Sequence, residues 1–169
     1  MGRWNIRWSI LLVLWCVTGV KLAAMKVESL DRGWFFNRGY ESQAADKVTV
    51  DLPHTWNAAD AMFGNVNYYR GMSTYSRFIV VPSSENFKRV FLRVKAAQTV
   101  ADVYLDNHFV AQHKGGYTSF TVELTHLIRR GEKQKLDIRV SNAQTMEIAP
   151  ICGDFNIWGG LNRGVELLY

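Results

Sequence analysis

The feature that most constrains the fold of this chain is the recurrence of an apolar residue at every second position in several short segments. Apolar and polar residues alternate over residues 48–52, 74–81 and 90–94, and turn signals such as Pro53 and Pro82 bound these segments. Side chains of a β-strand point alternately to opposite faces, so this period predicts strands with one buried and one solvated face. Such strands must pair into sheets that bury one face against another layer.

A tight hairpin is predicted further along the chain. Residues 100–105 lead into Asp106 and Asn107, two residue types that tolerate left-handed backbone, and residues 108–112 return as the second strand. Residues 124–130 are predicted to form one helical turn, which Gly131 stops. Further strands are expected at residues 120–124, 135–140 and 165–169. Many short strands without intervening helices predict an all-β fold, an antiparallel β-sandwich of the jelly-roll type, with an immunoglobulin-like sandwich as the alternative.

The amino terminus has the layout of a secretory signal peptide. Arg3 and Arg7 precede an apolar run at residues 9–20, which ends near small residues at 23 and 24. The run is shorter than the roughly 20 residues that span a bilayer as a helix. We therefore expect cleavage after Ala24, a single domain over residues 25–169, and a secreted or periplasmic product that meets the membrane only through its signal segment. A retained anchor and a lipoprotein signal are the alternatives.

The charge of the chain argues against a nucleic-acid partner. Loss of residues 1–24 removes Arg3, Arg7 and Lys21 but no acid, which lowers the formal charge from +5 to +2. A nucleic-acid-binding domain would carry a basic stripe, whereas the remaining basic residues are scattered. Cys152 would be the only cysteine left, so no internal disulfide is expected.

The sequence lacks most of the motifs that are typical of catalytic sites. The sequence contains no Gly-x-Ser-x-Gly elbow, no phosphate-binding glycine loop, no paired cysteines and no closely spaced histidines. We therefore expect no metal site and no cofactor. The aromatic residues Trp34, Trp56 and Tyr75 are expected in the core, and His54 is expected to bond loop backbone beside the packed Trp56.

The glycine pair Gly115-Gly116 follows the hairpin. Without side chains, these residues allow a sharp bend or the close approach of another segment. We expect Tyr117 and Phe120 to fill the space that the glycines leave open.

The most unusual segment is "GDFNIWGGLNR", residues 153–163, which lies directly before the last predicted strand. It is too polar for a core and too aromatic for an ordinary linker. Its carboxylate, Asp154, could accept charge-assisted hydrogen bonds from hydroxyl groups of a ligand. The alternative is that Asp154 caps the loop and that Arg163 pairs with an acid at the edge of the core.

Several segments, taken in order, resemble the amino-terminal sugar-binding domain of glycoside hydrolase family 2, the β-galactosidase, β-glucuronidase and β-mannosidase group. The resemblance rests on "LDRGWFFNRGY", "VDLPHTWNAAD", "YYRGMSTYSRFI", "ADVYLDNHFVAQHKGGYTSFTVELTHLI" and "GDFNIWGGLNRGVELL", which together cover most of residues 25–169. It implies a galactose-binding-like jelly roll and a carbohydrate partner, a β-linked glycoside.

The resemblance also implies site residues. Asp154 matches an acid that contacts sugar hydroxyls at the active site of a separate barrel, and Asn65, with Asn67 as its neighbour, matches an amide beside the same sugar. Trp158 and Phe155 could supply an apolar face to that sugar. No catalytic residue is expected in this chain, because retaining hydrolysis needs two carboxyl groups about 5 to 5.5 Å apart, which in this family come from the barrel.

Two functions of different class are therefore predicted. The first is the non-catalytic sugar-binding domain of a secreted β-glycosidase, whose immunoglobulin-like and catalytic barrel domains are expected as partners and are missing from this sequence. The second is a stand-alone carbohydrate-binding or structural β-sandwich module.

Overall fold

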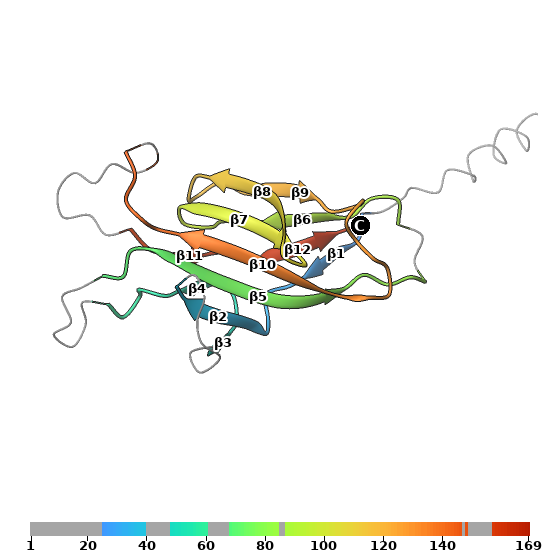
Figure 1. The fold of residues 1–169 in the computed structure, drawn as a ribbon, viewed down its shortest axis with the longest axis horizontal. Helices are drawn as coiled ribbons and strands as arrows, with labels where there is room; N and C mark the ends of the chain where they lie inside the picture. Colours follow the sequence, from blue (N-terminus) through green and yellow to red (C-terminus); the bar gives the residue numbers. More distant parts are fainter. Residues whose placement is uncertain (1–24, 40–47, 61–67, 85–86, 147, 149–156) are drawn as a thin grey trace, which may run out of the picture.

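The structure of the chain is a computed structural model, which describes residues 25–39, 48–60, 68–84, 87–146, 148 and 157–169 (Figure 1). Its strands are β1 (Val27–Ser29), β2 (Trp34–Arg38), β3 (Val48–Val50), β4 (His54–Thr55), β5 (Met72–Val80), β6 (Phe91–Val94), β7 (Val100–Leu105), β8 (His108–Lys114), β9 (Phe120–Glu123), β10 (Lys133–Ser141), β11 (Gly160–Leu161) and β12 (Val165–Leu168). The described residues form no helix, and accordingly none that is long and apolar enough to cross a membrane.

The strands form two facing sheets. One sheet has four strands in the order β1-β12-β6-β9, and the other has six in the order β3-β2-β5-β10-β7-β8 (Figure 1). Every pairing in both sheets is antiparallel. The chain passes repeatedly from one sheet to the other, since β5, β7 and β10 belong to the larger sheet while β6, β9 and β12 belong to the smaller. The predicted antiparallel jelly-roll sandwich is confirmed.

The core lies between the sheets and follows the period of two. In β7, Ala101, Val103 and Leu105 are buried and their neighbours are half-buried. In β10, Leu136, Ile138 and Val140 face the same core and are fully buried. Trp34 and Tyr75, both completely buried, meet edge to face with ring centroids 6.4 Å apart. The expectation that Trp34, Trp56 and Tyr75 are core residues is confirmed.

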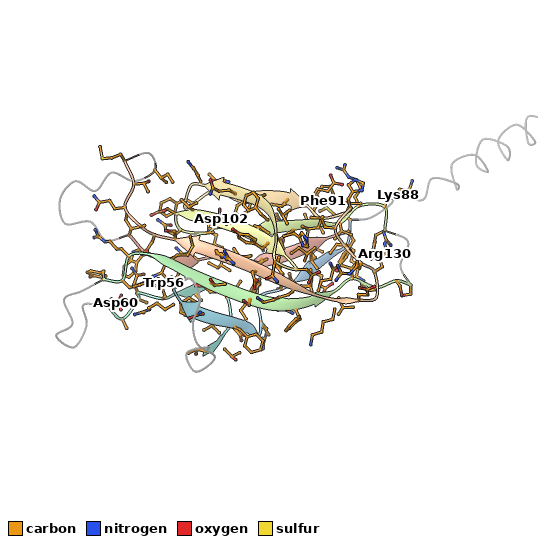
Figure 2. The ribbon with its side chains drawn as sticks, in the orientation of Figure 1. Trp56, Asp60, Lys88, Phe91, Asp102 and Arg130 are labelled. Carbon is orange, nitrogen blue, oxygen red and sulfur yellow. The ribbon has the colours of Figure 1, made fainter. Side chains whose placement is uncertain are left out.

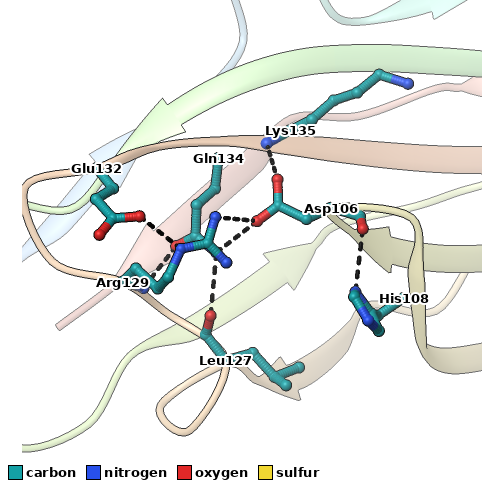
Figure 3. Close-up of polar contacts among 7 residues, drawn as sticks. All are labelled: Asp106, His108, Leu127, Arg129, Glu132, Gln134 and Lys135. Atoms are coloured by element: carbon teal, nitrogen blue, oxygen red, sulfur yellow. Dashed lines mark hydrogen bonds and ion pairs between the residues drawn. The ribbon is translucent and has the colours of Figure 1, made fainter.

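The predicted hairpin forms between β7 and β8. Asp106 and Asn107 connect the strands with φ angles of 48° and 66°, in the left-handed region. The carboxylate of Asp106 accepts hydrogen bonds from Gln134 Nε2 at 2.8 Å and from the Lys135 amide at 2.8 Å, and Arg129 lies 3.0 Å away (Figure 3). The buried Gln134 side chain also donates to the Leu127 carbonyl. This network ties the tip of the hairpin to β10 and to the loop before it.

The segment at residues 124–131 is a turn rather than a helix. The amides of Leu127 and Ile128 both donate to the Leu124 carbonyl, and Gly131 has a φ of 77°. The predicted single turn forms, but its hydrogen bonds close at Ile128, three residues before Gly131, where the prediction ended it.

The space beside Gly116 is filled by a residue that the sequence did not indicate. A β-carbon on Gly116 would lie 2.6 Å from Oε1 of the buried Gln98, so the glycine is needed for this close approach. Phe120 packs against the core as expected. The expectation for Tyr117 is wrong, because its side chain is 74% exposed and Gln98 already occupies the position beside the glycine.

Candidate functional site

The candidate site lies at the end of the sandwich where β4 and β11 form a small two-stranded sheet. Its floor is a cluster of aromatic side chains. Trp56 stacks on Phe36 with ring centroids 6.1 Å apart and meets Tyr69 edge to face at 6.3 Å. Trp56 and Phe36 are buried, so the cluster forms a rigid apolar base. Figure 2 labels Trp56 and Asp60 at this end of the molecule.

His54 belongs to this floor, and its half-buried ring is bonded to a neighbouring side chain. Its Nδ1 lies 2.8 Å from the Tyr75 hydroxyl, and its ring tilts over Phe36 at a centroid distance of 4.7 Å. Burial, followed by the charge of Arg38, lowers the pKa of His54 below its ordinary value of 6.5, which disfavours the protonated imidazole. The predicted bond of His54 to loop backbone is therefore corrected: the partner of its ring is the Tyr75 side chain.

Two asparagines on distant parts of the chain bind the same carbonyl. Asn57 and Asn142 are completely buried, and the Nδ2 of each lies 3.0 Å from the carbonyl oxygen of Ile157. Oδ1 of Asn57 also accepts the Gly159 amide at 2.9 Å. A carbonyl with two lone pairs can accept both donors, and these bonds spare the buried amide groups the free-energy cost of lacking a partner.

Asn142 also joins this carbonyl to the start of β5. Its Nδ2 donates to the Tyr69 carbonyl at 3.1 Å, and its Oδ1 accepts the Gly71 amide at 2.9 Å. On the other side of Tyr69, the Tyr69 amide donates to Asp60 at 2.9 Å. The backbone at residues 57–60, 69–71 and 157–159 is therefore held together by buried and partly buried hydrogen bonds.

Gly159 and Gly160 are required by the packing of this region. A β-carbon on Gly159 would lie 2.1 Å from the Trp56 ring. Gly160 has a φ of 142°, and a β-carbon there would lie 2.2 Å from the His54 carbonyl oxygen. The glycine pair thus allows the strand β11 to pass directly over Trp56 and pair with β4.

Between these anchored residues, Trp158 is exposed. Ile157 is buried. The Gly159 amide donates to Asn57, and the Gly159 carbonyl accepts a hydrogen bond from the Trp56 amide at 3.1 Å. The Trp158 side chain is nevertheless 45% exposed. An indole in water on a fixed backbone offers a flat apolar face and one N–H donor to a ligand.

Arg38 and Asp60 add charge beside this tryptophan cluster. The Arg38 guanidinium donates to the Trp56 carbonyl at 2.7 Å, lies 3.8 Å from Asp60 and stands over the Tyr69 ring at 5.1 Å. These contacts hold the guanidinium against the rim of the site.

The predicted site residues fall into two groups. Asp154, Asn65, Asn67 and Phe155 lie outside the described residues, whereas Trp158 is described and exposed. Arg163 is exposed and makes no ion pair with an acid in the described part of the chain. The sequence did not indicate Asn57 and Asn142, because asparagine in a loop is common and nothing in their spacing predicts a shared partner.

The described acids elsewhere have structural partners. Glu123 forms a bidentate pair with Arg89, and hydrogen bonds from Arg89 and Thr125 lower the pKa of Glu123 to about 2. Asp31 and Asp51 border an open cavity of about 580 Å³, and each accepts a backbone amide at 2.8 Å. No group of three or more potential metal ligands occurs among the residues that the structure describes.

Comparison with known proteins identifies the family of this chain. The family described as "Glycosyl hydrolases family 2, sugar binding domain" matches residues 26–169. This chain belongs to that family. The sandwich is therefore a glycoside hydrolase family 2 sugar-binding domain, as the resemblance of the sequence implied.

Individual members of the family support the assignment. The chain is 39% identical over 139 residues to a β-glucuronidase of Bacteroides fragilis, covering 82% of this chain and 20% of that protein. A β-galactosidase of Thermoanaerobacter pseudethanolicus is 31% identical over 121 residues, 70% of this chain and 16% of that protein. The crystal structure of an FMN-binding β-glucuronidase from Facaelibacterium prausnitzii L2-6 matches with a TM-score of 0.76 and 38% identity, covering 85% of this chain and 22% of that one. The chain thus spans about a fifth of the length of these relatives.

Proposed function

We propose that this chain is the non-catalytic sugar-binding domain of a secreted β-glycosidase that acts on β-glucuronides. Its contribution is to hold a sugar unit while catalytic carboxylates from another part of the enzyme cleave the glycosidic bond. The β-glucuronidase relatives, at 38 and 39% identity, favour a glucuronide over a galactoside. The alternative, a stand-alone carbohydrate-binding module, would need no such partner.

The proposed sugar contact is supported mainly by Trp158, whose side chain is exposed although the backbone on both sides of it is held by hydrogen bonds. A pyranose ring has an apolar face of C–H groups that stacks on an indole, and its hydroxyl groups need hydrogen-bond partners around that contact. We assign those partners to Asp154 and Asn65, with the Asp154 carboxylate accepting from sugar hydroxyls. Trp158 follows Asp154 by four positions in the sequence, so both side chains belong to one segment.

Hydrolysis by the chain alone is not expected. In the proposed enzyme the acid–base and the nucleophile lie in the barrel that the family resemblance implies, and the acids that the structure describes in this chain are engaged in structural bonds. The purified chain should release no nitrophenol from nitrophenyl β-glucuronide, β-galactoside or β-mannoside. Turnover that is lost on substituting a single acid of this chain would contradict the proposal.

The contribution of Asp154 can be tested in a chimera in which this chain replaces the matching domain of the Bacteroides fragilis β-glucuronidase. Asp154→Ala should lower kcat/KM, and the loss of transition-state stabilisation derived from it should be about 2 to 4 kcal/mol. This is the range for truncating one partner of a buried charged hydrogen bond. The melting temperature should change little. Asp102→Ala, which removes an acid that bonds Gln112 on the outer face of the larger sheet, is the control and should leave kcat/KM unchanged.

Two results would contradict the role of Asp154. One is a chimera whose kcat/KM on nitrophenyl β-glucuronide is the same for Asp154→Ala and for Asp102→Ala. The other is a large loss of melting temperature with normal turnover per folded molecule, which would make Asp154 structural.

A further inference from the structure

We propose that Asn57 and Asn142 are a positioning pair that presents the Trp158 indole to the sugar. The inference rests on the proposed sugar contact at Trp158 and extends it to two residues that cannot touch the ligand, since both are completely buried. They act through the backbone on each side of Trp158.

Each hydrogen bond of the pair to residues 157 and 159 fixes a backbone group next to Trp158. The carbonyl of Ile157, which forms the peptide bond to Trp158, receives both Nδ2 donors at 3.0 Å. The amide of Gly159, which forms the following peptide bond, donates to Asn57 Oδ1 at 2.9 Å. The peptide planes before and after Trp158 are therefore both fixed, which limits the directions in which its side chain can leave the backbone.

Among the residues that the structure describes, no other side chain bonds the Ile157 carbonyl. One asparagine would be enough to satisfy a buried carbonyl, which needs one partner to avoid the cost of burial. Two donors from residues 85 positions apart in the sequence restrain it in two directions instead of one. The second, Asn142, also bonds Tyr69 and Gly71, so the position of Trp158 is tied to the start of β5.

The order of the Trp158 side chain affects the affinity for a sugar. A side chain that is already ordered loses less conformational entropy when a ligand stacks on it. Loosening the backbone at residues 157–159 should therefore weaken the sugar contact without removing any atom that touches the sugar. A residue that only stabilises the fold would lower the melting temperature and leave the Trp158 side chain in one environment.

The experiment follows the Trp158 indole N–H by two-dimensional ¹⁵N NMR of the purified chain, with its signal assigned by its loss in Trp158→Phe. The variants are Asn57→Ala and Asn142→Ala, with Asn57→Ser and Asn142→Ser as a milder pair should the alanine variants not fold. Asn37→Ala is the matched control, because Asn37 is also buried, at 7% exposure, but lies on β2 outside the pair. Methyl β-D-glucuronide is the probe.

We expect the Trp158 signal to broaden or split in the variants of Asn57 and Asn142 and to remain single in Asn37→Ala, at temperatures where each protein is folded. The affinity for methyl β-D-glucuronide should fall about tenfold, the size expected for losing one buried hydrogen bond that orders the site. A single, unshifted Trp158 signal in both variants would overturn the inference. A broadened signal in the variants, with no response to the probe in the unaltered chain, would uphold the pair as a positioning device and overturn the proposed sugar site.

Discussion

At the scale of single residues, the contact between Gly159 and Trp56 determines how β11 crosses the aromatic floor. Because Gly159 has no side chain, its backbone can lie against the Trp56 ring, and its carbonyl accepts a hydrogen bond from the Trp56 amide. The indole of the neighbouring Trp158 remains 45% exposed. The backbone of Gly159 therefore covers the buried Trp56, while Trp158, one position before the glycine, stays exposed.

Gly159→Ala should destabilise the domain. The new β-carbon would lie 2.1 Å from the Trp56 ring, and forcing an extra methyl group into a packed region costs about 1 to 3 kcal/mol. The free energy of unfolding in urea measures this loss. In a Trp56→Leu background the clash is relieved, so the same substitution should cost much less, and an equal loss in both backgrounds would show that the contact is not its cause.

Glu166 gives a pH dependence to stability. Its carboxylate lies on the outer face of β12 and is bonded by Lys95 and Arg93. The bond from Lys95, followed by that from Arg93, lowers the pKa of Glu166 below its ordinary value of 4.5, although burial opposes this shift. The unfolded chain then binds a proton more readily than the folded one, so the stabilisation is complete above about pH 4.5 and is lost as the pH falls below it.

We expect Glu166→Gln to lower the free energy of unfolding at neutral pH and to flatten its decline in acid. Urea unfolding between neutral pH and about pH 3 measures both effects. Glu132→Gln, which alters an exposed carboxylate, is the control and should keep the acid decline. A Glu166→Gln curve parallel to that of the unaltered chain would rule out this linkage.

At the scale of secondary structure, most strands were predictable and some were not. The period of two located β5, β7 and β10, because long strands with one buried face carry a clear alternation. It missed β1, β4 and β11, which have two or three residues, too few to show a period. It also missed β2, where Phe35 is exposed between the buried Trp34 and Phe36, so three consecutive aromatic residues hide the alternation.

The candidate site was predictable only in part, for a related reason. Trp158 could be proposed from the mixture of aromatic and polar residues in its segment. The pairing of Asn57 with Asn142 depends on contacts across 85 positions of sequence, and no local pattern encodes such a contact. The position of Tyr117 was wrong because the glycine beside it makes room for Gln98, a residue from a different strand connection.

The network at the hairpin between β7 and β8 should stabilise the larger sheet. Asp106→Ala removes an acceptor for Gln134, for the Lys135 amide and for Arg129 (Figure 3). Leaving the buried Gln134 amide without this partner should cost about 1 to 3 kcal/mol in the free energy of unfolding. Asn107→Ala is the matched control, since it also places alanine at a positive φ but removes no carboxylate. Equal losses in the two variants would assign the effect to backbone strain alone.

At the scale of the whole molecule, the family match begins at residue 26, close to the expected cleavage site after Ala24. The basic and apolar pattern of residues 1–24 predicts export with loss of this segment. Mass spectrometry of the protein recovered from the periplasm or medium of a bacterial host should find an amino terminus at Met25. An intact Met1 on a membrane-bound product would contradict this prediction, and replacing the apolar run at residues 9–20 with polar residues should keep the protein in the cytoplasm.

The pairing of β1 with β12 brings the two ends of the described domain together. Val27 lies opposite Leu168, and the backbone groups of Lys26 and Tyr169 exchange hydrogen bonds of 3.1 and 2.8 Å (Figure 1). Domains with adjacent ends can be inserted into another protein, or circularly permuted, with little distortion of either part. Any sequence joined to residue 26 and any sequence joined to residue 169 would therefore leave the sandwich from neighbouring points on its surface.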